Sequence, residues 1–82
     1  MYMTANRIKI QGKPLLKLNI HDYDESDIPF LDHLGINEID SNHADCRYIH
    51  IHSKEDFLSI RSSIFERYNV IEEGPKAHLE AK

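Results

Sequence analysis

The sequence has 82 residues, of which 40% are hydrophobic and 29% charged, and its formal net charge is −4. This length allows one small hydrophobic core, which favours a surface groove or a flat binding face over a deep enclosed active site. No stretch approaches the roughly 20 apolar residues of a membrane span, and the first residues lack the apolar segment of a secretory signal. With the single cysteine Cys46, no intramolecular disulfide can form, so we expect a cytoplasmic protein with no membrane partner.

Charged residues are segregated along the chain. Residues 1–21 contain four basic residues and no acidic ones, whereas residues 22–45 contain eight acidic residues and no Lys or Arg. A chain laid out in this way carries a dipole, which orients a charged partner during its approach.

Residues 7–20 predict a β-hairpin. Apolar residues alternate with polar ones in both halves, at Ile8, Ile10, Leu16, Leu18 and Ile20. This two-residue period is typical of strands, and Gly12 with Lys13 is expected to form the turn.

A short helix is predicted next. Ser26 or Asp27 can cap it, Pro29 fits its first turn, and Gly35 stops it. Residues 36–40 are interpreted as a short strand or a loop, and residues 46–53 as a further strand.

The clearest helix begins at Lys54. Ser53 and Asp56 have the spacing of a capping box, and apolar residues recur every three or four positions from Phe57 to Ile71. The pattern predicts a helix of about five turns that ends at Gly74.

The predicted fold is therefore a single α+β domain over residues 1–75, followed by a frayed tail at residues 76–82. Its small antiparallel sheet has ββαββα or ββαβα order, and one short and one long helix pack on one face.

His50 and His52 raise the question of a metal site. They alternate with Ile49 and Ile51, which we expect to point into the core, so both histidines are predicted on the opposite face, about 7 Å apart. Two ligands fall short of the three or four that a zinc site needs. We therefore expect neither a metal nor another cofactor, and a metal-binding protein that uses His50 and His52 is the third and least favoured functional hypothesis.

Catalytic motifs are not evident either. The calcium-loop spacing that begins at Asp22 has Asp27 where glycine is required and His33 where glutamate is required. No motif orients a histidine toward Cys46, and each glycine is explained by a turn or a helix end. We expect a protein that is not an enzyme.

Our main hypothesis is a small regulatory or inhibitory protein that binds another protein, possibly through its acidic central segment. The predicted partner-binding residues are Asp22, Asp24, Glu25, Asp27, Tyr48, His50 and His52. The predicted fold also allows a homodimer, because an open sheet face or a sheet edge is readily covered by a second copy of the chain.

The alternative hypothesis is nucleic-acid binding by a basic open sheet face. The residues predicted to form that face are Arg7, Lys9, Lys17 and Tyr48. The negative net charge weighs against it, because attraction to phosphates dominates such binding.

Overall fold

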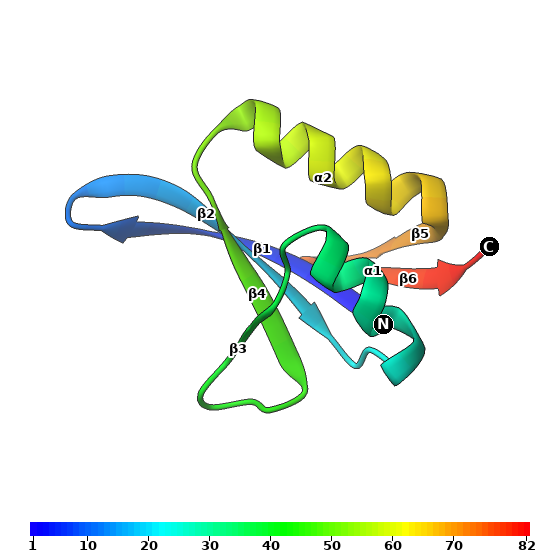
Figure 1. The fold of residues 1–82 in the computed structure, drawn as a ribbon. Helices are drawn as coiled ribbons and strands as arrows, with labels where there is room; N and C mark the ends of the chain where they lie inside the picture. Colours follow the sequence, from blue (N-terminus) through cyan, green and yellow to red (C-terminus); the bar gives the residue numbers. More distant parts are fainter.

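The structure is a computed structural model that describes all 82 residues (Figure 1). Its elements, in chain order, are β1 (Tyr2–Ile10), β2 (Lys13–His21), a 3-10 helix η1 (Glu25–Asp27), α1 (Ile28–His33), β3 (Glu38–Ile39), β4 (Cys46–Ile51), α2 (Lys54–Arg67), β5 (Tyr68–Glu73) and β6 (Lys76–Ala81).

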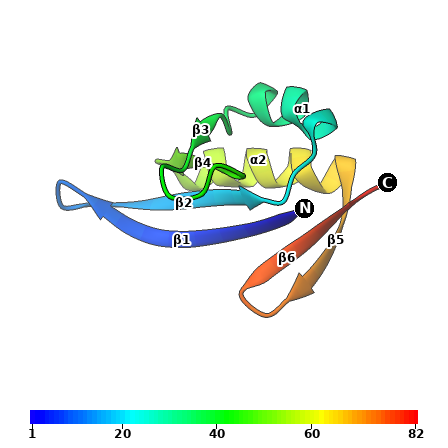
Figure 2. The ribbon, with the colours of Figure 1, turned by 90° about the horizontal axis from the view of Figure 1, so that it is seen from below.

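The six strands form one antiparallel sheet in the order β3-β4-β2-β1-β6-β5. Both α-helices lie on the same side of this sheet (Figure 2), which we call the helix face. The other side carries no helix, and we call it the open face. The predicted α+β class, with one short and one long helix on one face, is confirmed, and β3 shows that part of residues 36–40 forms a strand.

The turn between β1 and β2 lies one residue earlier than predicted. Ile10 pairs with Lys13, so the two loop residues are Gln11 and Gly12. Both have positive φ, 51° and 78°. This is the combination that a two-residue type I′ turn requires, and such a turn matches the right-handed twist of the flanking strands.

The register of this hairpin decides which side chains share a face. Arg7 lies opposite Leu16, which in turn lies opposite the buried Ile51 of β4. Directly opposed residues of antiparallel strands project to the same side. Arg7 and Lys9 therefore lie on the helix face, whereas Ile8 lies on the open face.

The short helix α1 forms as the sequence predicts. Asp27 is its N-cap residue, Pro29 lies in its first turn, and Gly35 takes a φ of +82° immediately beyond its end. Leu31 is the buried residue of this helix and joins the core between helices and sheet.

The long helix is shorter than predicted, and the predicted tail is wrong. The Ser53 hydroxyl accepts a hydrogen bond from the Asp56 N–H at 3.1 Å, as the capping pattern indicates, but α2 ends at Arg67. Residues 68–73 and 76–81 form the hairpin β5–β6, with Gly74 at a φ of +65° in the turn. Aromatic and β-branched residues favour strands, and in this sheet Tyr68 and Leu79 are buried.

The core lies between the helix face and the two helices. It consists of eight buried residues: Leu18, Ile20, Leu31, Ile36, Ile51, Ile64, Tyr68 and Leu79. No helix is long and apolar enough to cross a membrane.

Candidate protein-binding surface

The loop after β2, residues 22–27, carries four acidic residues, and we call it the acidic loop. Asp22 takes a φ of +55°, a conformation that Asp tolerates better than most residues, and it ends the strand. Asp22, Asp24 and Glu25 are exposed. Three of the predicted partner-binding carboxylates are therefore available at the surface.

The fourth carboxylate, that of Asp27, is already engaged within the chain. Its Oδ1 accepts a hydrogen bond from the Tyr68 hydroxyl at 2.9 Å, and its Oδ2 accepts one from the Asp24 N–H at 3.0 Å. Hydrogen bonds to a charged acceptor are stronger than neutral ones. Asp27 therefore anchors the acidic loop within the chain. It differs in this from the free partner-binding carboxylate that the sequence predicts.

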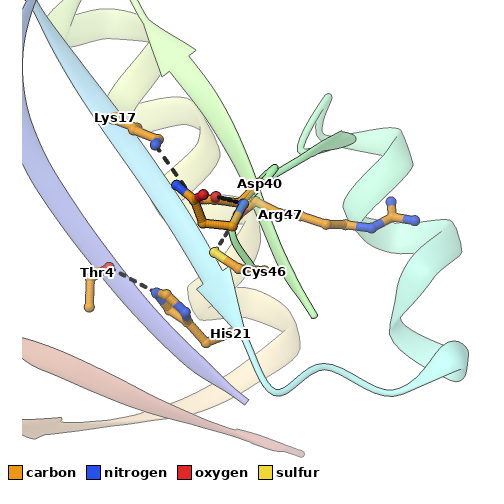
Figure 3. Close-up of polar contacts among 7 residues, drawn as sticks. Thr4, Lys17, His21, Asp40, Cys46 and Arg47 are labelled. Carbon is orange, nitrogen blue, oxygen red and sulfur yellow. Dashed lines mark hydrogen bonds and ion pairs between the residues drawn. The ribbon is translucent and has the colours of Figure 1, made fainter. Parts of the chain in front are cut away.

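A polar depression of about 370 Å³ adjoins the acidic loop. It is lined by Tyr2, Thr4, His21, Asp22, His43, Asp45 and Lys76. Nε2 of His21 lies 3.3 Å from the Thr4 hydroxyl (Figure 3), a contact that orients the imidazole within the depression. The depression thus joins the acidic loop to the loop between β3 and β4.

Tyr48 and His50 lie together on the open face, as predicted. Their ring centroids are 5.3 Å apart, and the Lys17 ammonium lies 4.4 Å from the centre of the Tyr48 ring. Lys17 also lies 3.9 Å from Asp40 (Figure 3), whose pKa is lowered, first by a hydrogen bond from the Asn42 N–H and then by Lys17.

Three other predicted binding residues lie outside the cluster of Tyr48, His50 and Lys17. They are Arg7, Lys9 and His52. Arg7 and Lys9 lie on the helix face, opposite Leu16 and Pro14. His52 follows the end of β4 and lines a groove together with Arg7 and Phe57. The predicted basic face of Arg7, Lys9, Lys17 and Tyr48 is therefore divided between the two sides of the sheet.

A second aromatic cluster lies on the open face where β1 meets β6. Tyr2 and His78 are opposite each other and stack with centroids 4.8 Å apart, and the Lys76 ammonium lies 4.4 Å from the centre of the Tyr2 ring. These residues are not among the predicted site residues, because residues 76–82 are predicted to form a frayed tail. The alternation of Lys76 and His78 with Ala77 and Leu79 is the signal that could have revealed them.

Cys46 is buried, with 2% of its surface exposed. Burial raises the pKa of its thiol, and the nearby carboxylate of Asp40 acts in the same direction. Since the thiolate is the reactive form of cysteine, a buried thiol with a raised pKa is a poor nucleophile.

No group of three or more His, Cys, Asp or Glu side chains is arranged to hold a metal ion.

Comparison with known proteins finds no matching family model, no similar curated protein and no similar solved structure.

Proposed function

We propose that this chain is a non-catalytic regulatory or inhibitory protein that binds a basic surface of another protein through Asp22, Asp24 and Glu25. The observation that carries the proposal is the pair of hydrogen bonds from Tyr68 and Asp24 to Asp27. The first ties the acidic loop to the start of β5 and the second closes the loop on itself, and both contacts restrict the loop before any partner arrives.

Such preorganisation favours binding, because a fixed loop loses less conformational entropy on association than a flexible one. The acidic and basic side chains are also unevenly distributed over the surface. Asp45 lines the polar depression together with Asp22 and adds a further exposed carboxylate to this side of the molecule, where Lys76 is the one Lys or Arg residue of the lining. Clustered charge of one sign speeds the encounter with a surface of the opposite sign and orients it.

The test uses tagged full-length protein captured from the cells that produce it, with bound proteins identified by mass spectrometry. The identified partner is then purified, and its affinity for the chain is measured by calorimetry. The triple variant Asp22→Asn, Asp24→Asn and Glu25→Gln is expected to bind at least about tenfold more weakly than the parent chain.

The matched control is Glu66→Gln with Glu73→Gln and Glu80→Gln, which changes the same amount of charge at exposed positions outside the acidic loop. It should leave the affinity unchanged. An equal loss in both triple variants, or no loss in the first, would exclude the acidic loop as the binding surface.

A second candidate function is single-stranded nucleic-acid binding by the open face. The observation that favours it is the pair of cation-capped aromatic clusters, Lys17 over Tyr48 and Lys76 over Tyr2. Both tyrosines are half-buried, so a base would stack on the ring face that the lysine now covers. The displaced ammonium would then be next to a phosphate, which it attracts.

This candidate is tested by fluorescence anisotropy with a labelled single-stranded RNA at two salt concentrations. Tyr48→Ala and Tyr2→Ala should each weaken binding, whereas Lys9→Ala, on the helix face, should have much less effect. Absence of binding at low salt, or equal losses in all three variants, would eliminate it.

A further inference from the structure

Strand β1 has an unpaired edge. On one side it pairs with β2 along its whole length, but on the other side it pairs with β6 only at Tyr2 and Met3. Beyond Met3 the β1–β2 hairpin extends away from the β5–β6 hairpin (Figure 2). The stretch from Thr4 to Ile10 therefore has no strand beside it on this edge.

The main-chain groups that face this edge can be identified. The Met1 carbonyl accepts a hydrogen bond from the Leu79 N–H at 2.8 Å, so Met1 faces β6. Successive residues of a strand direct their N–H and C=O groups to opposite sides. Ala5, Arg7 and Lys9 consequently face the unpaired edge, and we call them the free edge.

Strand β6 stops where the free edge begins. The β1–β6 pairing ends at Met3 opposite Ala77, and β6 itself begins at Lys76, directly after the β5–β6 turn at Gly74 and Pro75. Proline has no N–H and cannot continue a ladder. A strand added to the free edge would therefore lie in line with β6, and its end beside Ala5 would meet the β5–β6 turn, whose Gly74 and Pro75 line the same groove as Ala5.

The side chains of the free edge indicate the chemistry of such a strand. Ala5, Arg7 and Lys9 all lie on the helix face and are exposed. A groove of about 190 Å³ lies next to Ala5, between β1, α2 and the β5–β6 hairpin, and can receive a small apolar side chain there. It is lined by Met3, Ala5, Leu18, Phe57, Glu72, Gly74, Pro75, Lys76 and Ala77. A second groove, of about 370 Å³, adjoins Arg7 and is lined by Lys54 as well as Leu16 and Phe57.

We propose that the free edge binds an extended acidic segment of a partner protein as an additional antiparallel strand. Opposed residues share a face, so the segment places acidic side chains opposite Lys9 and Arg7 and an apolar one opposite Ala5. Read from its N-terminus, its pattern is acidic, any, acidic, any, apolar. This interface is separate from the acidic loop and goes beyond the function proposed above.

The charges of the free edge argue against a symmetric pairing of two copies through β1. An antiparallel pair of β1 strands would bring together two sets of Arg7 and Lys9, and like charges on neighbouring strands repel. No acidic residue lies between Met1 and His21 to compensate them.

The probe is the peptide Glu-Thr-Glu-Thr-Val, labelled and blocked at both ends, with binding measured by fluorescence anisotropy. Three versions of this peptide, which have the same side chains and differ only in N-methylation, test the main-chain hydrogen bonds. The unmodified peptide should bind, N-methylation of both Glu residues and Val should abolish binding, and N-methylation of the two Thr residues should not, because their N–H groups point away from β1.

The protein variants test the charge. Arg7→Glu with Lys9→Glu should weaken binding about tenfold or more, whereas Lys13→Glu with Lys82→Glu makes the same charge change away from the free edge and should have little effect. Peptide binding should also slow amide exchange at Ala5, Arg7 and Lys9.

Three results would overturn the proposal. They are no binding up to about 1 mM peptide, equal loss on methylation at either set of positions, and a protein that is already dimeric with the free-edge amides protected. In the last case the edge belongs to a second copy. None of these outcomes bears on the acidic loop, whose variants leave Ala5, Arg7 and Lys9 unchanged.

Discussion

The Tyr68 hydroxyl donates a hydrogen bond of 2.9 Å to the Asp27 carboxylate, 41 positions earlier in the chain. Tyr68 is the first residue of β5, directly after α2, and Asp27 precedes α1. The Phe30 ring of α1 lies 5.8 Å from the Tyr68 ring, centre to centre. One side-chain pair thus ties the acidic loop and the short helix to the end of the long helix.

Replacement of this tyrosine tests the tie. Tyr68→Phe keeps the ring and removes the hydrogen bond to a charged acceptor, so we expect the free energy of unfolding to fall by about 1 to 2 kcal/mol in urea denaturation. The Asp24 amide should also exchange faster. Tyr48→Phe removes a hydroxyl on the open face and should change neither quantity; similar losses in both variants would contradict the assigned role of Tyr68.

The same hydroxyl makes stability depend on alkaline pH. Burial raises the pKa of Tyr68 above its ordinary 10.0, and the neighbouring Asp27 carboxylate adds to the shift. Above pH 10 the unfolded chain releases this proton while the folded chain keeps it, so the folded state binds more protons and stability falls as pH rises. Tyr68→Phe should lose less stability than the parent chain above pH 10 and show the same dependence below it; identical curves would count against the shift.

Arg47 connects β4 to α1. Its Nη1 donates a hydrogen bond of 2.7 Å to the Asp32 carboxylate, and its guanidinium lies 5.3 Å from the centre of the Tyr23 ring. Figure 3 shows the side chain directed toward α1. Because Asp32 is exposed, we expect Asp32→Ala to cost only about 0.5 to 1 kcal/mol, and Arg47→Ala to cost more through lost packing. A double-mutant cycle measures the coupling free energy between Arg47 and Asp32. A value near zero would show that the contribution of Arg47 to stability comes from packing alone.

Cys46 should react slowly in the native protein. Its thiol is buried and its pKa is raised, so little thiolate is accessible at pH 7. We expect alkylation by iodoacetamide to be at least about 100-fold slower in buffer than in denaturant, with a rate that follows opening of the fold. Rapid native alkylation would mean that the thiol is accessible and would reopen a reactive role for it.

Leu79 tests whether β6 is part of the folded structure. It is only 3% exposed and belongs to the core, so Leu79→Ala should lower the free energy of unfolding by about 2 to 4 kcal/mol. The neighbouring Glu80→Ala, at an exposed position on the open face, should change it by less than about 0.5 kcal/mol. If Leu79→Ala left the free energy of unfolding unchanged, residues 76–82 would be a frayed tail, as the sequence predicts.

The elements with strong local signals were predictable. Ser53 caps α2, Asp27 and Gly35 bound α1, and Ile49 and Ile51 pack toward the core while Tyr48 and His50 lie on the open face. In each case, the residues that decide the structure are neighbours in sequence.

The end of α2 was not predictable from periodicity. Tyr68 and Ile71 continue the helical spacing from Ile64, yet Tyr68 and Val70 also alternate as in a strand. Pairing with β6 and burial of Leu79 decide between the two, and both are long-range contacts.

The division of the basic residues could have been anticipated. In a hairpin with a two-residue loop, odd-numbered residues of one strand lie opposite even-numbered residues of the other. Arg7 and Lys17 are both odd-numbered, so they must lie on opposite faces. The hydrogen bond to the Asp27 carboxylate could not have been anticipated, because its donor Tyr68 lies 41 residues away in the sequence.

The direct passage from α2 into β5, with no residue between Arg67 and Tyr68, constrains changes in chain length. One residue inserted into the helix would rotate everything after it by about 100°, since a turn has 3.6 residues. Tyr68 would then turn away from Asp27, and the side chains of β5 would no longer match the two faces of the sheet. Homologous chains should therefore keep the length of this helix fixed and accept insertions in the loop between β3 and β4, where residues 41–45 are exposed.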